Sequence, residues 1–186
     1  VLDTAVDSIL HLNMSDEQIL TYEMQFLNTY EDFPNGMYIG YDDGKVLDAS
    51  GWEPDTDIRQ STWYTEGLTH DTFEFGEPYI DALTGEYIIT ASRRLDNLNR
   101  KTAVAAADVS LSVLSEIVDV MEVAGNGDAF ILDTVSTSIL AHKDVSLIGT
   151  PVAECSDPFY QNLYMDISSG NTSCIQYSSV DGTYMV

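Results

Sequence analysis

The same order of predicted elements occurs twice along this chain: two strands, one short helix and two more strands. In the first copy, "MYIGYDDGKVLDAS" predicts a hairpin around the two-residue turn Asp43-Gly44, "STWYTEGLTH" predicts the helix, and strands follow in "PYIDALTGEYIITASRRL" and "NRKTAVAAADVS". The second copy comprises "GDAFILDTVSTSILAH", "DPFYQNLYMDIS" and "TSCIQYSSVDGTYMV", whose turn is Asp181-Gly182. Consecutive strands around one short helix favour small antiparallel sheets. We therefore expect an α+β fold with two antiparallel-sheet subdomains.

Helical segments precede and join the two copies. Residues 1–31 are predicted to be helical, with an interruption at "NMSDEQIL", where Ser15 and Gln18 have the spacing of a capping box. An apolar face that runs from Leu111 to Met121 predicts a second helix, which "AGNG" ends. The predicted boundaries are residues 1–31 for the N-terminal helical segment, 32–110 for the first subdomain, 111–124 for the linking helix and 125–186 for the second subdomain.

The charge of the chain narrows the classes of partner. The sequence contains 31 acidic and 7 basic residues, which gives a formal net charge of −24. Such a surface repels nucleic acid and anionic lipid headgroups, so we expect neither as a partner. No apolar run is long enough to span a membrane, and no signal peptide is visible. The chain begins within a predicted helix and ends within a predicted strand, so we expect it to be an excerpt from a longer protein.

Residue patterns that carry catalysis or hold a metal are missing from the sequence. The three histidines lie far apart, and no glycine-rich phosphate loop, nucleophile elbow or C-x-x-C motif is present. The acidic groups at Asp42-Asp43, Asp55 and Asp57 do not match a calcium-binding loop. We therefore expect no enzyme, no metal site and no cofactor. Cys155 and Cys174 can form one disulfide or remain two buried thiols, and the sequence leaves both alternatives open.

Four segments together resemble the double Cache (dCache) sensor domains, which are extracytoplasmic input modules of bacterial chemoreceptors, sensor kinases and diguanylate cyclases. "DIRQSTWY" is similar to the family's D-P-R-x-R-x-W-Y, and "PYIDALTGEYIITAS" to its P-Y-x-D-x-x-T-G segment. "AAADVSLSVLSEIV" and "GDAFILDTVSTSILAHKD" resemble the end of the first subdomain and the start of the second. The resemblance implies a long N-terminal helix beside two PAS-like subdomains. The first would be membrane-distal and bind the ligand, and the second, membrane-proximal one would be truncated after "DGTYMV".

Many members of this family bind amino acids, and several of their binding residues match positions in this chain. The family's W-Y pair falls on Trp63 and Tyr64, and its aspartate at the end of the last distal strand falls on Asp108. The tyrosine and the aspartate of its P-Y-x-D segment fall on Tyr79 and Asp81. The resemblance therefore implies that these five residues contact a ligand.

Three other positions depart from the amino-acid pattern. The family's tyrosine before D-P-R falls on Thr56, its second arginine falls on Ser61, and its acid after the W-Y pair falls on Glu66. In the family that arginine holds the ligand's α-carboxylate, and a buried carboxylate needs a paired cation. Arg59 matches the D-P-R arginine, which is usually structural. The loss at Ser61 is therefore the change with the largest consequence for the ligand.

The retained residues suit a ligand with a cationic group. Asp108, with Tyr79 and Glu66, would accept from an ammonium group, and Trp63 or Tyr64 could face it as a cation–π wall. With no arginine at position 61, this chemistry favours an amine or a quaternary ammonium compound over an α-amino acid. The expected partner is thus a small molecule of amine or amino-acid-like type.

A plainer interpretation exists for each of these residues. Trp63 and Tyr64 could be core aromatics of the short helix, Asp108 could cap the following helix, and Tyr79 could be an ordinary strand residue. On that interpretation the chain is a ligand-free structural module that acts by dimerisation or by binding a partner protein. The sequence leaves a homodimer of the full receptor open. Transmembrane helices outside this chain would be its connection to the cell membrane.

Overall fold

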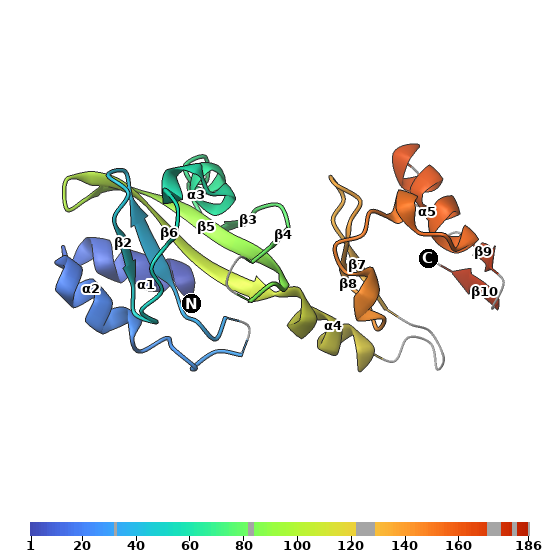
Figure 1. Ribbon diagram of the computed structural model, residues 1–186, viewed down its shortest axis with the longest axis horizontal. Coiled ribbons are helices and arrows are strands. Elements are labelled where there is room, and N and C mark those ends of the chain that lie inside the picture. Colours follow the sequence, from blue (N-terminus) through green and yellow to red (C-terminus); the bar gives the residue numbers. More distant parts are fainter. Residues whose placement is uncertain (32, 82–83, 122–128, 171–175, 180–181, 186) are drawn as a thin grey trace. The chain divides into compact units, whose positions relative to one another are not determined.

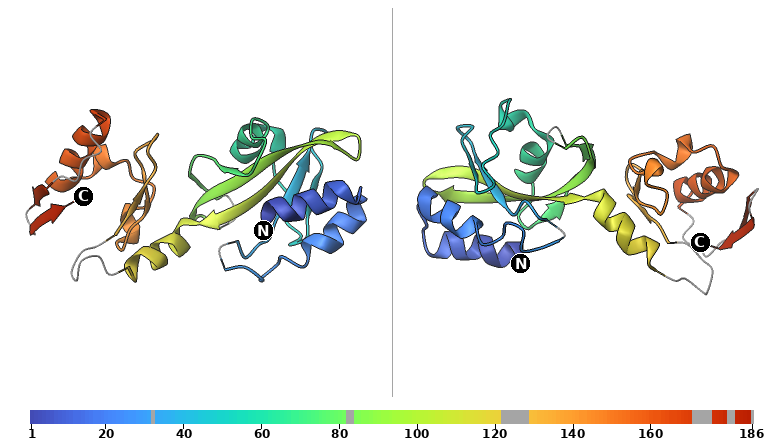
Figure 2. Two further views of the ribbon diagram at one scale, coloured as in Figure 1. Left: turned by 180° about the vertical axis from the view of Figure 1, so that it is seen from behind. Right: turned by 60° about the horizontal axis from the view of Figure 1, so that its bottom comes forward.

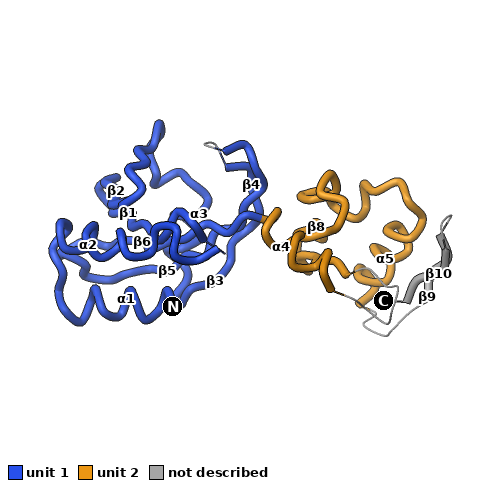
Figure 3. The backbone as a smooth tube through the Cα atoms, turned by 90° about the horizontal axis from the view of Figure 1, so that it is seen from below, with its two compact units in different colours: residues 1–110 blue, residues 111–186 orange. Residues whose placement is uncertain are grey.

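The computed structural model describes residues 1–31, 33–81, 84–121, 129–170, 176–179 and 182–185. It divides into two compact units, residues 1–110 and 111–186 (Figure 3). Each unit combines helices with antiparallel strands, so the predicted α+β class is confirmed. Among the described residues, no helix combines the length and the apolar character that a membrane crossing requires.

A six-stranded antiparallel sheet forms the centre of unit 1 (Figure 1). Its strands follow the order β2-β1-β6-β5-β3, and β4 also pairs with β5. β5 and β6 are the two longest strands and pair with each other, and the shorter strands are added on either side of them. The strands are β1 Tyr38–Tyr41, β2 Val46–Asp48, β3 Glu74–Phe75, β4 Tyr79–Ile80, β5 Tyr87–Leu98 and β6 Lys101–Ser110.

Two turns define the registers of these strands. Between β1 and β2, the backbone N–H of Tyr41 donates to the Lys45 carbonyl at 2.8 Å, and Gly44 has a φ of +88°. The loop therefore contains three residues and ends on a left-handed glycine, which corrects the predicted two-residue turn. Between β5 and β6, Asn99 and Arg100 have φ values of 51° and 69°, the arrangement of a two-residue hairpin turn.

Two short helices cover one face of the sheet (Figure 2). They are α1 Leu2–His11 and α2 Asp16–Glu23, so the predicted interruption is present, the helical part ends before residue 31, and the long N-terminal helix that the resemblance implies is replaced by two short ones. The break has the predicted cause: Ser15 accepts from the N–H of Gln18, and the Gln18 side chain accepts from the N–H of Ser15. The apolar sides of both helices pack against inward-facing strand residues in one core. That core includes Val6, Ile9, Ile19, Ile39, Leu47, Leu95, Ala103, Ala105 and Ala107.

The opposite face of the sheet carries α3 Thr62–Gly67, which follows the short 3-10 turn η1 Ile58–Gln60 (Figures 1 and 2). Two glycines let this helix lie directly on the strands. A Cβ at Gly40 would lie 2.6 Å from the Trp63 ring, and a Cβ at Gly67 would lie 2.4 Å from Cγ1 of Val104. Because side chains alternate along a strand, Val104 and Ala106 face α3, whereas their neighbours face α1 and α2.

Unit 2 begins with α4 Leu111–Asp119, and the end of the predicted linking helix at residues 122–124 lies outside the described residues. The hairpin predicted around Asp181-Gly182 has its two strands, but residues 180–181 of its turn are also outside. The further elements of unit 2 are β7 Ile131–Leu132, β8 Ile139–Ala141, η2 Val145–Leu147, η3 Val152–Glu154, α5 Pro158–Ser168, β9 Gln176–Ser179 and β10 Gly182–Met185.

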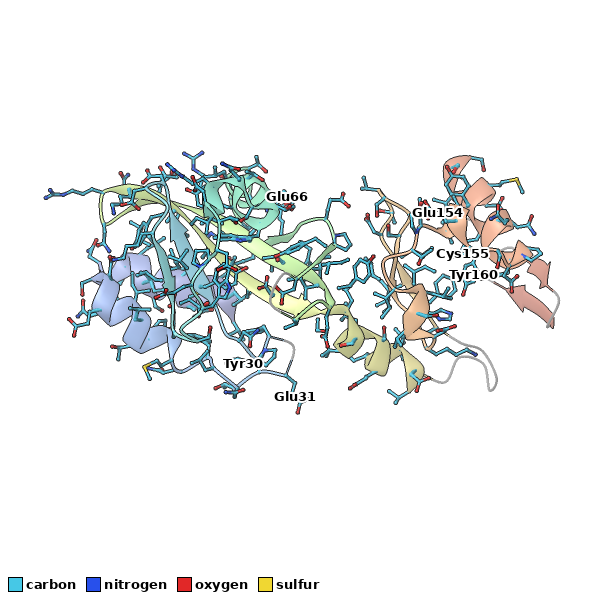
Figure 4. The ribbon with its side chains drawn as sticks, in the orientation of Figure 1. Tyr30, Glu31, Glu66, Glu154, Cys155 and Tyr160 are labelled. Carbon is cyan, nitrogen blue, oxygen red and sulfur yellow. The ribbon has the colours of Figure 1, made fainter. Side chains whose placement is uncertain are left out.

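A separate core holds unit 2 together, formed mainly by β8, η3 and α5. His142 links its parts through hydrogen bonds. Its backbone N–H donates to Ser115 Oγ on α4 at 3.2 Å, and its ring Nε2 lies 2.9 Å from the Tyr160 hydroxyl on α5. Cys155 is a buried, free thiol in the described part of the chain, while Cys174 lies outside it. Figure 4 shows Cys155 and Tyr160 in this unit.

Candidate ligand-binding site

Four polar side chains from four different strands meet on the α3 side of the sheet in unit 1. The Tyr38 hydroxyl donates to Oδ1 of Asp108 at 2.9 Å, and the Thr90 hydroxyl donates to the same oxygen at 2.6 Å. The Tyr79 hydroxyl lies 2.8 Å from Oγ1 of Thr90. These residues, which we call the Asp108 cluster, are therefore joined by an unbroken set of hydrogen bonds.

Strand register explains why these residues meet. Thr90 of β5 is directly opposite Asp108 of β6, and Tyr79 of β4 is directly opposite Ile88, two residues before Thr90. Tyr38 of β1 is opposite Ala106, two residues before Asp108. Residues that are opposite, or two positions apart on neighbouring strands, share one face of a sheet. The cluster is thus a consequence of pairing between segments that are distant in sequence.

The electrostatic surroundings of Asp108 are unusual for an aspartate. Burial raises the pKa of its carboxyl, the Thr90 and Tyr38 hydrogen bonds lower it, and the neighbouring charges of Asp81 and Asp48 raise it further. The net pKa lies above the ordinary value for aspartate. Burial, together with the Asp108 charge, also raises the pKa of the Tyr38 and Tyr79 hydroxyls, so both stay protonated.

The basic residues of unit 1 lie away from this carboxylate. Arg59 pairs with Asp57 and reaches the Asp42 carbonyl at the β1–β2 loop, at the far end of β6 from Asp108. Arg93 faces α1, where it pairs with Asp3 and Asp7. The remaining basic residues form the pairs Lys45–Asp16, Arg94–Asp96 and Lys101–Asp43, or, for Arg100, occupy the β5–β6 turn. Within the described residues of unit 1, Asp108 therefore has hydrogen-bond donors but no ion-pair partner.

The two predicted aromatic residues are part of the core between α3 and the sheet. Trp63 and Tyr64 are only 4% and 3% exposed, respectively. The Trp63 ring meets the Tyr38 ring edge-on, with 5.0 Å between centroids, and it contacts Tyr64 in the same manner at 5.5 Å. Trp63 thus adjoins the cluster through Tyr38. Tyr64 lies toward Asp42 and Arg59, whose charges act on its hydroxyl.

The other predicted residues occupy the surroundings of α3 and β4. Ser61 is the N-cap residue of α3, but its side chain makes no capping hydrogen bond, and Thr56 is exposed. Glu66 lies on α3, where its Oε2 accepts from the N–H of Glu77 at 3.3 Å (Figure 4). Asp81 closes the β4–β5 connection by accepting from the Thr84 N–H and hydroxyl at 3.0 and 2.7 Å. Of these four residues, Asp81 is the one whose charge raises the pKa of Asp108.

Sequence reasoning missed Tyr38 and Thr90, the two donors to Asp108. Both sit in predicted strands, on the side that alternation assigns to Asp108 once the registers are known. A polar residue directly after the apolar pair Ile88 and Ile89 was the available signal at Thr90. Among the described residues, no group of three or more histidine, cysteine or acidic side chains is placed to hold a metal ion.

Comparison with known proteins gives consistent results. The family model described as "Methyl-accepting chemotaxis protein-like, first PDC sensor domain" matches residues 6–116. The methyl-accepting chemotaxis protein PscA of Pseudomonas syringae is 32% identical over 124 residues, which are 66% of this chain and 20% of that protein. This chain therefore spans about a fifth of the length of that relative.

Solved structures of chemoreceptor domains have the same fold. The ligand-binding domain of the Pseudomonas fluorescens chemoreceptor CtaA in complex with L-valine is 25% identical with a TM-score of 0.67, covering 82% of this chain and 68% of that one. The same domain with L-serine gives a TM-score of 0.72 at 22% identity, over 98% of this chain and 76% of that one. The similarity of fold thus extends through both units.

Proposed function

This chain belongs to the family of methyl-accepting chemotaxis protein-like first PDC sensor domains, and we propose that it senses a small amine-type ligand through the Asp108 cluster. The observation that carries the proposal is the state of the Asp108 carboxylate. It receives hydrogen bonds from Tyr38 and Thr90 but has no ion-pair partner among the described residues of unit 1. A partly buried carboxylate without a cation is stabilised when a ligand supplies one.

The residues that would surround an α-carboxylate favour an amine over an α-amino acid as the ligand. An α-carboxylate that enters this region loses its water, and it gains stability only if a cation pairs with it. Ser61 is at the position of the family arginine, and Arg59 is held by Asp57 at the β1–β2 loop. The neighbouring charges of Asp81 and Asp48 act on Asp108 and raise its pKa. These charges favour a cation without a carboxylate.

The proposal includes the place of the domain in a longer protein. By its resemblance to double Cache domains, this chain would be the extracytoplasmic part of a chemoreceptor in a bacterial cell membrane. A homodimer of the full receptor is part of the same proposal. The alternative is a ligand-free module of such a receptor, which would act by dimerisation or by binding a partner protein.

A thermal-shift screen with matched compounds tests this function. The series comprises isobutylamine, L-valine and isobutyrate, which share an isopropyl group and carry an ammonium group, both charged groups and a carboxylate, respectively. Binding to the folded state raises the melting temperature by mass action. We expect the shift to be largest for isobutylamine and absent for isobutyrate. A melting temperature that no amine or amino acid changes would instead favour the ligand-free alternative.

A further inference from the structure

The hydrogen atoms of the Asp108 cluster can be assigned from its geometry. An ionised carboxylate offers only acceptors, so the 2.6 Å contact between Thr90 Oγ1 and Asp108 Oδ1 requires Thr90 to donate. Tyr38 likewise donates its hydroxyl proton to Oδ1. A threonine hydroxyl has one hydrogen, and Thr90 uses it on Asp108. The 2.8 Å contact with Tyr79 must therefore be a donation from Tyr79 to Thr90.

All three hydroxyl protons thus point inward, along the order Tyr79 to Thr90 to Asp108, with Tyr38 as the second donor. The packing holds this direction in place, because Tyr38 is 6% and Thr90 2% exposed. Both donated hydrogen bonds end on Oδ1 of Asp108. Oδ2 of Asp108 and the lone pairs of the Tyr79 oxygen accept none of these hydrogen bonds, and toward a ligand they can act as acceptors only.

We propose that Thr90 and Tyr38 are positioning residues that orient the cluster as an acceptor-only surface, and that this surface selects a primary ammonium group. This inference rests on the proposed function. A primary ammonium group has three N–H donors and no acceptor, so it can pair with Oδ2 of Asp108 and the Tyr79 oxygen together. A quaternary ammonium group has the same charge but no N–H, and so it forgoes those hydrogen bonds. The inference therefore separates two ligand classes that net charge alone does not.

The test compares Thr90→Val with Thr90→Ser. Valine removes the hydroxyl while keeping a side chain of similar shape, and serine restores the hydroxyl, so Thr90→Ser is the matched control. Calorimetry measures the affinity of each protein for isobutylamine and for isobutyltrimethylammonium. We expect the wild type and Thr90→Ser to prefer the primary amine by about tenfold or more, the scale of one charge-assisted hydrogen bond. In Thr90→Val the preference should shrink to about threefold or less, because Asp108 keeps only the Tyr38 donor and Tyr79 loses the acceptor for its proton.

A second readout needs no ligand. Carbon-detected NMR follows the titration of the Asp108 carboxyl in the 186-residue chain. Thr90→Val and Tyr38→Phe should each move this titration to higher pH, because the ionised form loses one donor, and Thr90→Ser should leave it in place. If Thr90→Val does not fold, Tyr38→Phe carries the same comparison.

The outcomes separate this inference from the proposed function. If the wild type binds neither cation but the Asp108 titration shifts as described, the cluster is oriented as stated and the amine-sensing function is wrong, together with the selection of a primary ammonium. An unchanged titration in Thr90→Val and Tyr38→Phe would overturn the positioning role. Amine binding with equal affinity for both cations would overturn the acceptor-only surface while leaving amine sensing intact.

Discussion

Two carboxyl groups are buried against opposite faces of the same sheet in unit 1, and their surroundings differ completely. Glu23, on the α2 side, is 0% exposed, and neither of its oxygens has a hydrogen-bond partner in the described structure. Burial, with a smaller contribution from the charge of Asp48, raises its pKa to about 9. Asp108, on the α3 side, keeps part of its surface exposed and receives two hydrogen bonds on one oxygen.

The contrast shows that burial alone does not distinguish a ligand-binding carboxylate from a carboxyl group that is buried in the core without a partner. Desolvation is the largest cause of a raised pKa at both residues. Only Asp108 has donors that stabilise its ionised form, and only Asp108 keeps part of its surface exposed. Glu23 is neutral at physiological pH and, with Ile19, is one of the two buried residues of α2. An ionised carboxylate with donors on one oxygen suits recognition at Asp108, whereas at Glu23 the buried site favours the protonated acid.

The largest expected effect concerns Glu23, whose carboxyl has no hydrogen-bond partner in the described structure. Glu23→Gln should stabilise the protein by roughly 3 kcal/mol at pH 7, because folding no longer requires an acid of ordinary pKa 4.5 to take up a proton. The folded-state pKa is the higher one, so the wild type is favoured at low pH and loses stability as pH rises. Relative to Glu23→Gln, its free energy of unfolding should fall by about 1.4 kcal/mol per pH unit from pH 4.5 to about 9 and then level off.

Urea unfolding across this pH range measures the difference. Glu17→Gln makes the same chemical change on the exposed side of the same helix, and it is the control. A difference between wild type and Glu23→Gln that stays constant from pH 5 to 9 would mean that Glu23 is ionised in the folded protein, and the comparison of the two faces would fail.

The second effect is on binding. Asp108→Asn keeps the shape of the cluster and removes its charge, so it should weaken isobutylamine binding by about 1.5–3 kcal/mol, the scale of a hydrogen bond to a charged group. Asp71→Asn removes one charge from an exposed loop of the same unit and serves as the control for general attraction by the acidic surface. Calorimetry at one ionic strength should show a loss in the first variant only. Equal losses in both would assign the affinity to net charge.

Acidification should have a related, graded effect on the amine affinity. Protonation of Asp108 removes the charge that holds the ligand, so binding is present above the pKa of this carboxyl and is lost as pH falls through it. Because that pKa is raised, the loss should begin at higher pH than for an exposed aspartate. An amine affinity that is constant down to the ordinary aspartate range would contradict a ligand contact at Asp108.

The smallest expected effect is a change of ligand preference by Ser61→Arg. Ser61 makes no capping hydrogen bond with its side chain, so the substitution should cost little stability. An arginine there returns the group that the family uses for an α-carboxylate, and it should improve L-valine relative to isobutylamine by about 1 kcal/mol. Ser61→Lys is the control for charge without the planar fork of arginine. If Ser61→Arg changes the affinities for L-valine and isobutylamine by the same factor, the ligand's carboxylate does not bind near position 61.

Local signals predicted much of this structure. Ser15 and Gln18 predicted the capping box, and the segment "STWYTEGLTH" was correctly expected to form a short helix, which is α3. The extent of the helix within residues 1–31 was predicted less well. Helical spacing would place Met24 on the same inner face as Leu20, but Met24 is 63% exposed, because α2 ends at Glu23 and the chain leaves the helical path. The buried position instead falls to Glu23, an acid that no propensity rule would place in a core.

The Asp108 cluster was harder to predict than the elements that carry it. Asp108 and Tyr79 were identified through a family motif, but their partners were not. Tyr38 and Asp108 are 70 residues apart, and Thr90 and Asp108 are 18 apart. Their contact depends on registers among four strands, and a shift of one residue in any of them would send a side chain to the α1 face. Propensity and periodicity identify strands without setting such registers.

One calorimetric comparison tests the central claim: Asp108 binds the cationic group of a ligand, in a site that has no positively charged side chain of its own. The wild type and Asp108→Asn are each titrated with isobutylamine and with L-valine, its amino-acid parent. The account predicts that the wild type binds isobutylamine more tightly than L-valine and that Asp108→Asn loses most of the amine affinity. A wild type that prefers L-valine, or an Asp108→Asn variant that binds isobutylamine as well as the wild type does, would contradict it.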